Sequence, residues 1–215
     1  MFIGHHAVGF GSKKYAPATS AGALLLAPML LDVLWPIFVL MGIEHFRIDP
    51  GNTAFTPLDF YDYPWSHSLL MAVVWSVLAA IAYYAATKYK PGAIAIGIGV
   101  VSHWFFDFIT HRPDLPLYPG GPKVGLGLWN SIAGTAVVET LLFALGIYLY
   151  VSVTRARDRA GSIGFWSLIA VLSLIYVANV MGGPPPSAEV VAWMALLALL
   201  FPLWAWWADR HRTLR

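Results

Sequence analysis

The 215-residue chain contains no cysteine, and this absence excludes three kinds of chemistry. Without thiols there is no disulfide framework, no thiolate metal ligand and no cysteine nucleophile. Charged residues are also scarce, because Asp, Glu, Lys and Arg make up 11% of the chain, against about 25% in a typical soluble domain. The formal net charge of +2 is too small to indicate binding to nucleic acid.

Hydrophobic residues, in contrast, make up 59% of the chain, which also contains ten Trp and ten Tyr. This composition favours an integral membrane protein with aromatic residues at the membrane interfaces. A helix needs about 20 apolar residues to cross a hydrocarbon core of about 30 Å. Six segments satisfy this requirement: 18–43, 67–87, 92–109, 125–153, 163–181 and 188–208. We therefore predict an all-α fold, a polytopic membrane bundle of about six transmembrane helices in one domain over residues 1–215.

Basic residues predict how this bundle is oriented. Ten lie on one side of the predicted spans: Lys13, Lys14, Lys88, Lys90, Arg155, Arg157, Arg159, Arg210, Arg212 and Arg215. Three lie on the other side: Arg47, Arg112 and Lys123. Because cytoplasmic loops carry the excess of Lys and Arg, we expect both termini in the cytoplasm and the loops 44–66 and 111–124 outside.

Ionisable residues inside a membrane span are costly, so each is a candidate functional residue. Apart from Glu189 near the start of the sixth, the predicted spans contain Asp32, His67, His103, Asp107 and Glu139. His103, Asp107 and, at the outer end of the third span, His111 are spaced four residues apart, which places them within about 80° on one helix face. An imidazole nitrogen and a carboxylate oxygen on one face suit a divalent metal. The alternative is a buried His–Asp hydrogen bond that holds helices together.

The other candidates each have two interpretations. Glu139 is a metal ligand or a base for metal-bound water, or else a protonated side chain bonded to a neighbouring helix. Arg112 binds an anionic substrate group, or it anchors the interface and pairs with Asp114. His5 and His6 join the cluster if the first segment is re-entrant; otherwise they form a cytoplasmic pair without a role.

Four short segments occur in an order that resembles the bacterial membrane-bound metal-dependent hydrolase family. They are GHHAVGFG, APMLLDVLWP, YPWSHSLL and SHWFFDFITHRPDLPLYPGGP, and the resemblance covers roughly residues 4–145. More distantly, the order is similar to that of zinc-dependent phospholipase C and the related single-strand nucleases. The resemblance implies that Asp32, His67, His103 and Asp107 bind one metal, that His111 and Glu139 serve a second, and that His5 is the N-terminal ligand.

The chain also departs from these families. Its Asp segment has one acidic residue where the membrane family often has two, the segment before His67 lacks His-Arg-Gly, and Thr135 stands where the phospholipases have a histidine. We therefore expect one or two ions rather than three. Zinc suits the ligands best, and Mn²⁺ and Fe²⁺ are compatible with them.

These features predict a metal-dependent hydrolase of the bacterial inner membrane. Metal-activated water would attack an ester or phosphoester, such as a lipid, at the outer face, with Glu139 and Arg112 as catalytic residues. Residues 1–153 would build the metal site, and the helices in 163–208 would be structural, with membrane lipid as the surrounding partner. Two alternatives remain: a transporter of divalent metal or protons, and a non-catalytic subunit with a structural metal.

Overall fold

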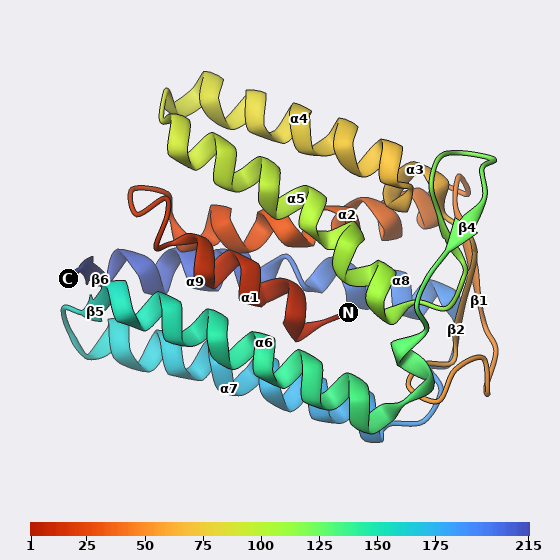
Figure 1. Ribbon diagram of the computed structural model, residues 1–215. Helices are drawn as coiled ribbons and strands as arrows, with labels where there is room; N and C mark the ends of the chain where they lie inside the picture. Colours follow the sequence, from red (N-terminus) through yellow and green to blue (C-terminus); the bar gives the residue numbers. More distant parts are fainter.

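Six apolar helical segments form the body of the molecule, which a computed structural model describes over all residues, 1–215 (Figure 1). Five of them are single helices: α2 (Ala21–Leu40), α4 (Leu69–Thr87), α5 (Lys90–Thr110), α6 (Ile132–Val153) and α7 (Arg159–Met181). The sixth consists of α8 (Ala188–Leu197) followed by α9 (Leu200–Arg210). Each segment is long and apolar enough to cross a membrane, which confirms the predicted polytopic helical bundle.

A further helix, α1 (Ile3–Ser12), lies inside this bundle, and its first turn is at mid-length (Figure 1). It packs mainly against α6 and α2, and both contacts depend on glycines. A Cβ atom on Gly9 would lie 2.6 Å from the carbonyl oxygen of Leu24, and one on Gly146 would lie 2.5 Å from the carbonyl oxygen of Ala7. Small residues at helix contacts allow backbones to approach closely in membranes. The first segment therefore inserts into the bundle and buries His5 and His6 completely, while its re-entrant path through the membrane stays a prediction.

Three of the differences from the predicted spans have a local reason. The fourth span begins at Ile132 instead of residue 125, because Gly127 has a φ of 73° and Ser131 caps the helix by accepting a hydrogen bond from the Gly134 nitrogen. The sixth span breaks between Leu197 and Leu200, just before Pro202, which has no N–H to donate to the preceding turn. The second span is preceded by a separate turn, α3 (Pro64–His67), since the backbone at Ser68 is extended.

Short antiparallel strand pairs cover both ends of the bundle, and the all-α prediction did not include them. At one end β1 (His45–Ile48) pairs with β2 (Leu58–Asp62), and β3 (Leu115–Pro116) pairs with β4 (Lys123–Val124). At the opposite end β5 (Thr154–Ala156) pairs with β6 (Arg212–Leu214) (Figure 1). The strands β1 to β4 thus belong to the loops with three basic residues, and β5 and β6 belong to the side of the bundle with ten. Which end faces the cytoplasm stays a prediction.

The interior contains two main apolar clusters. One joins α1, α6, α7 and α9 with the start of α2 around Phe10 and Leu168, and the other joins the rest of α2 with α4 and α5 around Leu31 and Val100. Many large apolar side chains of α4 instead point outward, including Val77 and Ile81. An apolar outer surface is expected where helices face lipid. The histidines and aspartates described below lie between the two clusters, where α1, α2, α3 and α5 meet.

Candidate metal centre

Four donor atoms from three elements converge near the end of the bundle that carries β1 and β2. His103 and Asp107 come from α5, His67 from α3 and Asp32 from the middle of α2. The Nε2 atom of His103 lies 3.2 Å from Nε2 of His67, 3.7 Å from Oδ1 of Asp32 and 3.0 Å from Oδ2 of Asp107. Nε2 of His67 lies 3.5 Å from the same Asp32 oxygen and 3.8 Å from the same Asp107 oxygen. The sequence predicted these four residues as ligands of one site. The structure groups Asp32, His67 and His103 and places Asp107 beside the two histidines, and whether all four bind one ion stays a prediction.

The other ring nitrogens of both histidines are bound to fixed partners. Nδ1 of His103 lies 2.7 Å from the carbonyl oxygen of Pro28, and a carbonyl only accepts hydrogen bonds. Nδ1 of His67 lies 2.7 Å from Oγ of Ser66, whose hydroxyl donates to Glu44. Both histidines therefore carry their hydrogen on Nδ1 when neutral, and both direct an Nε2 lone pair toward the other.

This arrangement favours a positive charge between the donors. Two lone pairs 3.2 Å apart, with two carboxylates beside them, repel one another unless protons or a metal ion neutralise them. In a tetrahedral zinc site with bonds of about 2.0–2.1 Å, neighbouring ligand atoms lie about 3.3 Å apart. The triangle formed by His67, His103 and Asp32 has sides of 3.2, 3.5 and 3.7 Å, so its donors fit one face of such a site without rearrangement.

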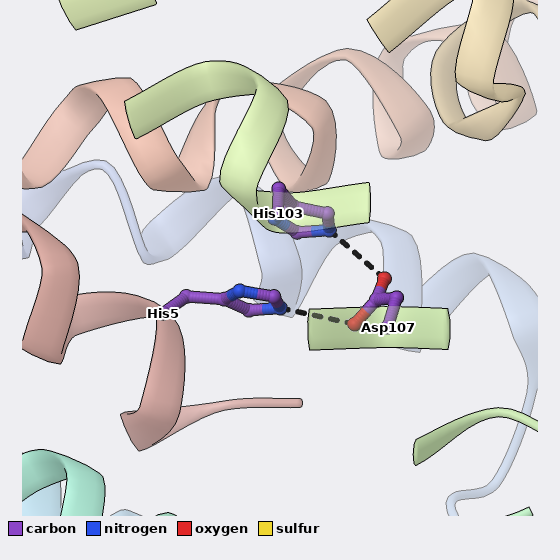
Figure 2. A group of neighbouring side chains, drawn as sticks. All are labelled: His5, His103 and Asp107. Carbon is purple, nitrogen blue, oxygen red and sulfur yellow. Dashed lines mark hydrogen bonds and ion pairs between the residues drawn. The ribbon is translucent and has the colours of Figure 1, made fainter. Parts of the chain in front are cut away.

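His5 forms a second group of donors with His103 and Asp107, and this group shares His103 with the first. Its ring stacks on that of His103, with centroids 3.8 Å apart and an angle of 8° between the planes. Its Nε2 lies 3.1 Å from Oδ1 of Asp107, while Nδ1 has no hydrogen-bond partner (Figure 2). The amino group of Met1 lies 2.8 Å from the same Asp107 oxygen. His6 is also buried, but its Nδ1 bonds to the carbonyl oxygen of Phe2 and it belongs to neither group.

His111 lies on the other side of Asp107. As the residue that caps the end of α5, it keeps the predicted spacing, and its Nε2 is 3.6 Å from Oδ2 of Asp107. Its Nδ1 lies 2.9 Å from Oδ1 of Asp114, which also accepts a hydrogen bond from the hydroxyl of Tyr63. Burial, and then the charge of Asp114, raises the pKa of Tyr63 well above 10, so its phenol stays protonated and donates.

The two residues predicted as catalytic lie outside both groups of donors. Oε2 of Glu139 accepts hydrogen bonds from the backbone nitrogens of Phe2 and Gly4, so this carboxylate caps the start of α1, while Oε1 has no partner. Whether Glu139 is a ligand or a base stays a prediction. The Arg112 guanidinium bonds to Asp59 and Asp114, and these contacts favour the alternative in which Arg112 pairs with Asp114.

Access to the site differs among its members. The side chain of Asp32 is 33% exposed, whereas those of His5, His67, His103, Asp107 and His111 are at most 5% exposed. The centre is therefore closed around the histidines and opens at Asp32.

Most of the outer partners of these histidines could not be predicted from the sequence. Glu44 and Asp114 belong to the predicted loops, and their contacts with Ser66 and His111 depend on how those loops fold back onto the bundle. A polar residue directly beside a candidate ligand, as Ser66 is beside His67, is the one local sign that the sequence offered.

Comparisons with known proteins identify the family. The family model described as YdjM inner membrane protein matches residues 64–211, which is more than half of the chain. The match includes His67, His103 and Asp107, whereas His5 and Asp32 precede it. No curated protein and no solved structure matches the chain. The chain is therefore a multi-pass membrane protein that belongs to the YdjM inner membrane protein family.

Proposed function

We propose that this protein is a metal-dependent hydrolase whose centre is built from Asp32, His67, His103 and Asp107. The observation that carries the proposal is the pair of Nε2 lone pairs 3.2 Å apart, both oriented by fixed partners on Nδ1, with two carboxylates beside them. One divalent ion would offset the negative charge of the two carboxylates, of which Asp107 also accepts a hydrogen bond from the Met1 ammonium. This offset favours occupancy because unpaired charge inside a membrane protein is costly.

The donors suit zinc, which prefers imidazole and carboxylate ligands in a tetrahedral arrangement, and Mn²⁺ or Fe²⁺ would also accept them. A second ion has fewer donors. His5 lies beside Oδ1 of Asp107 and His111 beside Oδ2, so this carboxylate could bridge two ions. We propose one or two ions for this reason.

A bound divalent metal supplies a nucleophilic water near neutral pH, which permits hydrolysis without a serine or cysteine nucleophile. The residues of the chain would exclude bulk water on the histidine side and leave the edge at Asp32 open to substrate. Glu139 is the proposed proton acceptor, since its Oε1 has no other partner. Because the centre lies within the bundle near one end, an ester or phosphoester of a lipid is the proposed substrate class.

Metal content is the first test. Wild-type protein purified in detergent without added chelator should contain about one equivalent of metal or more by elemental analysis. His103→Ala and Asp107→Ala should lose it, and Asp32→Asn, which keeps the shape of a partly exposed side chain, should weaken it. His45→Ala is the matched control, because His45 pairs with Asp62 at the surface, away from the centre. Wild-type protein without metal, or ligand variants with wild-type metal content, would refute the proposal.

Activity then separates hydrolysis from the alternatives. The metal-loaded protein should hydrolyse lipid esters or phosphoesters in mixed micelles, should stop when a chelator removes the metal and should recover when the metal returns. Metal-sensitive ion uptake into proteoliposomes without hydrolysis would instead support a transporter. A tightly bound metal with neither activity would indicate a structural site.

A further inference from the structure

Glu44 is a buried carboxylate with an unusually complete set of partners. It follows α2 and precedes β1, yet its side chain has no exposed surface. Oε1 accepts hydrogen bonds from the backbone nitrogens of Trp65 at 2.7 Å and Ser66 at 2.8 Å. Oε2 accepts a hydrogen bond from the hydroxyl of Ser66 at 2.6 Å. All three donors belong to the short turn α3, which carries His67.

The direction of these bonds determines the state of His67. The serine hydroxyl has one hydrogen, and Glu44 accepts it. Oγ of Ser66 therefore acts as an acceptor toward Nδ1 of His67, 2.7 Å away, so the imidazole hydrogen resides on Nδ1. The lone pair is left on Nε2, which faces His103 and Asp32.

We propose that Glu44 is a positioning residue that acts through the Ser66 hydroxyl to hold His67 in the tautomer whose Nε2 is free to bind a metal. The inference rests on the proposed metal site and adds a residue 23 positions before the ligand it controls. Partners of this kind behind a metal-binding histidine set its tautomer and ring orientation.

His67 and His103 differ in a way that makes the inference testable. Nδ1 of His103 bonds to the backbone carbonyl of Pro28, and no side-chain substitution reverses the direction of that bond. The tautomer of His67 depends on side chains alone, so a change at Glu44 or Ser66 can reverse it.

The variant Glu44→Gln separates positioning from a merely structural role. Its amide oxygen can still accept from the two backbone nitrogens, but its NH₂ group would then face Ser66 as a donor. The serine hydroxyl would have to accept from the amide and donate to His67, which places the imidazole hydrogen on Nε2. The fold and the volume are kept, while the lone pair turns away from the metal. Ser66→Ala removes the link, and Ser66→Thr restores a hydroxyl at the same position.

Two measurements test this inference: zinc affinity by competition with a chromogenic chelator, and imidazole nitrogen shifts by NMR in metal-free, ¹⁵N-histidine-labelled protein. Glu44→Gln and Ser66→Ala should raise the Kd for zinc about 10–100-fold, and Ser66→Thr should remain close to wild type. Glu189→Gln is the matched control, because Glu189 is exposed on α8. The NMR signal that His67→Ala removes, recorded at a pH at which this imidazole is neutral, should show hydrogen on Nδ1 in wild type and on Nε2 in Glu44→Gln.

The outcomes distinguish this inference from the proposed function. Wild-type zinc affinity and an unchanged tautomer in Glu44→Gln would overturn the positioning role while the metal site stands. Failure of Ser66→Thr to recover the affinity lost in Ser66→Ala would also overturn it. If the wild type binds no zinc, the proposed function fails, and the tautomer in the metal-free protein still decides what Glu44 does to His67.

Discussion

Helix α1 carries His5 into the bundle, and its contact with α2 leaves no room for a side chain at Gly9. A Cβ atom there would lie 2.6 Å from the carbonyl oxygen of Leu24, whereas ordinary van der Waals contact begins at 3.4 Å. Gly9→Ala therefore requires α1 and α2 to separate by about 0.8 Å. The obstacle is backbone, so no side-chain rotation relieves it. Overpacking of this kind typically costs about 1–3 kcal/mol.

Gly11 provides a matched control on the same helix. A Cβ atom at Gly11 would lie 3.3 Å from Cδ1 of Leu149, the end of a flexible side chain. Replacing either glycine by alanine gains about the same helix propensity, roughly 1 kcal/mol, so the difference between the two variants isolates the clash. We expect Gly9→Ala to be less stable than Gly11→Ala by about 1–3 kcal/mol, or roughly 2–12 °C in Tm for a chain of this size.

Thermal unfolding in detergent, followed by intrinsic tryptophan fluorescence, measures this difference. Zinc titration gives a second readout, because displacement of α1 moves His5, whose Nε2 lies 3.1 Å from Asp107, away from the centre. The affinity should fall in Gly9→Ala and not in Gly11→Ala. If Gly9→Ala proves as stable as Gly11→Ala and binds zinc equally well, then the close contact between α1 and α2 and the placement of His5 are both wrong.

Two further predictions concern the opposite end of the bundle. Asp209→Ala should destabilise the protein by about 3–5 kcal/mol, because it leaves the buried ammonium of Lys13 and the hydroxyl of Tyr150, each 2.7 Å away, without their carboxylate. Asp209→Asn keeps one acceptor, so its Tm should fall less. Equal Tm values for all three proteins would contradict the reasoning. The hydrogen bond with His211, and then that from the Gly161 nitrogen, holds the pKa of Asp158 below its usual 3.8, so its stabilising effect is present above that pH and is lost as the pH falls below it. The Tm difference between wild type and Asp158→Ala should therefore shrink on acidification from pH 6 to pH 3, and a difference that grows would reverse the assigned sign.

The six membrane segments could be predicted from the sequence because an apolar run of about 20 residues is a local property. The boundaries that failed depend on single residues within those runs. Gly127 and Ser131 delay the start of α6, and Pro202 follows the break in the sixth segment, yet all three lie in stretches that remain apolar overall. The strand pairs at the two ends were not predicted, since each strand is only two to five residues long.

The site divides in the same way. His103 and Asp107 share a helix face because residues four apart on a helix are neighbours, and this follows from the sequence. Asp32 and His67 could be predicted as candidates because charge is costly in an apolar span. The bonds of Arg112 to Asp59 and of Glu139 to the start of α1 join residues 53 and more than 130 positions apart, and no local pattern encodes them.

The sequence by itself thus determined that the chain crosses the membrane as a helical bundle and that α5 presents a histidine and an aspartate on one face. Only the tertiary structure decided that α1 inserts His5 beside them and that Glu44 reaches His67 through Ser66. The physical reason is that apolar length and helix periodicity act over neighbouring residues. The direction of a hydrogen bond into the centre depends instead on which distant segments pack together.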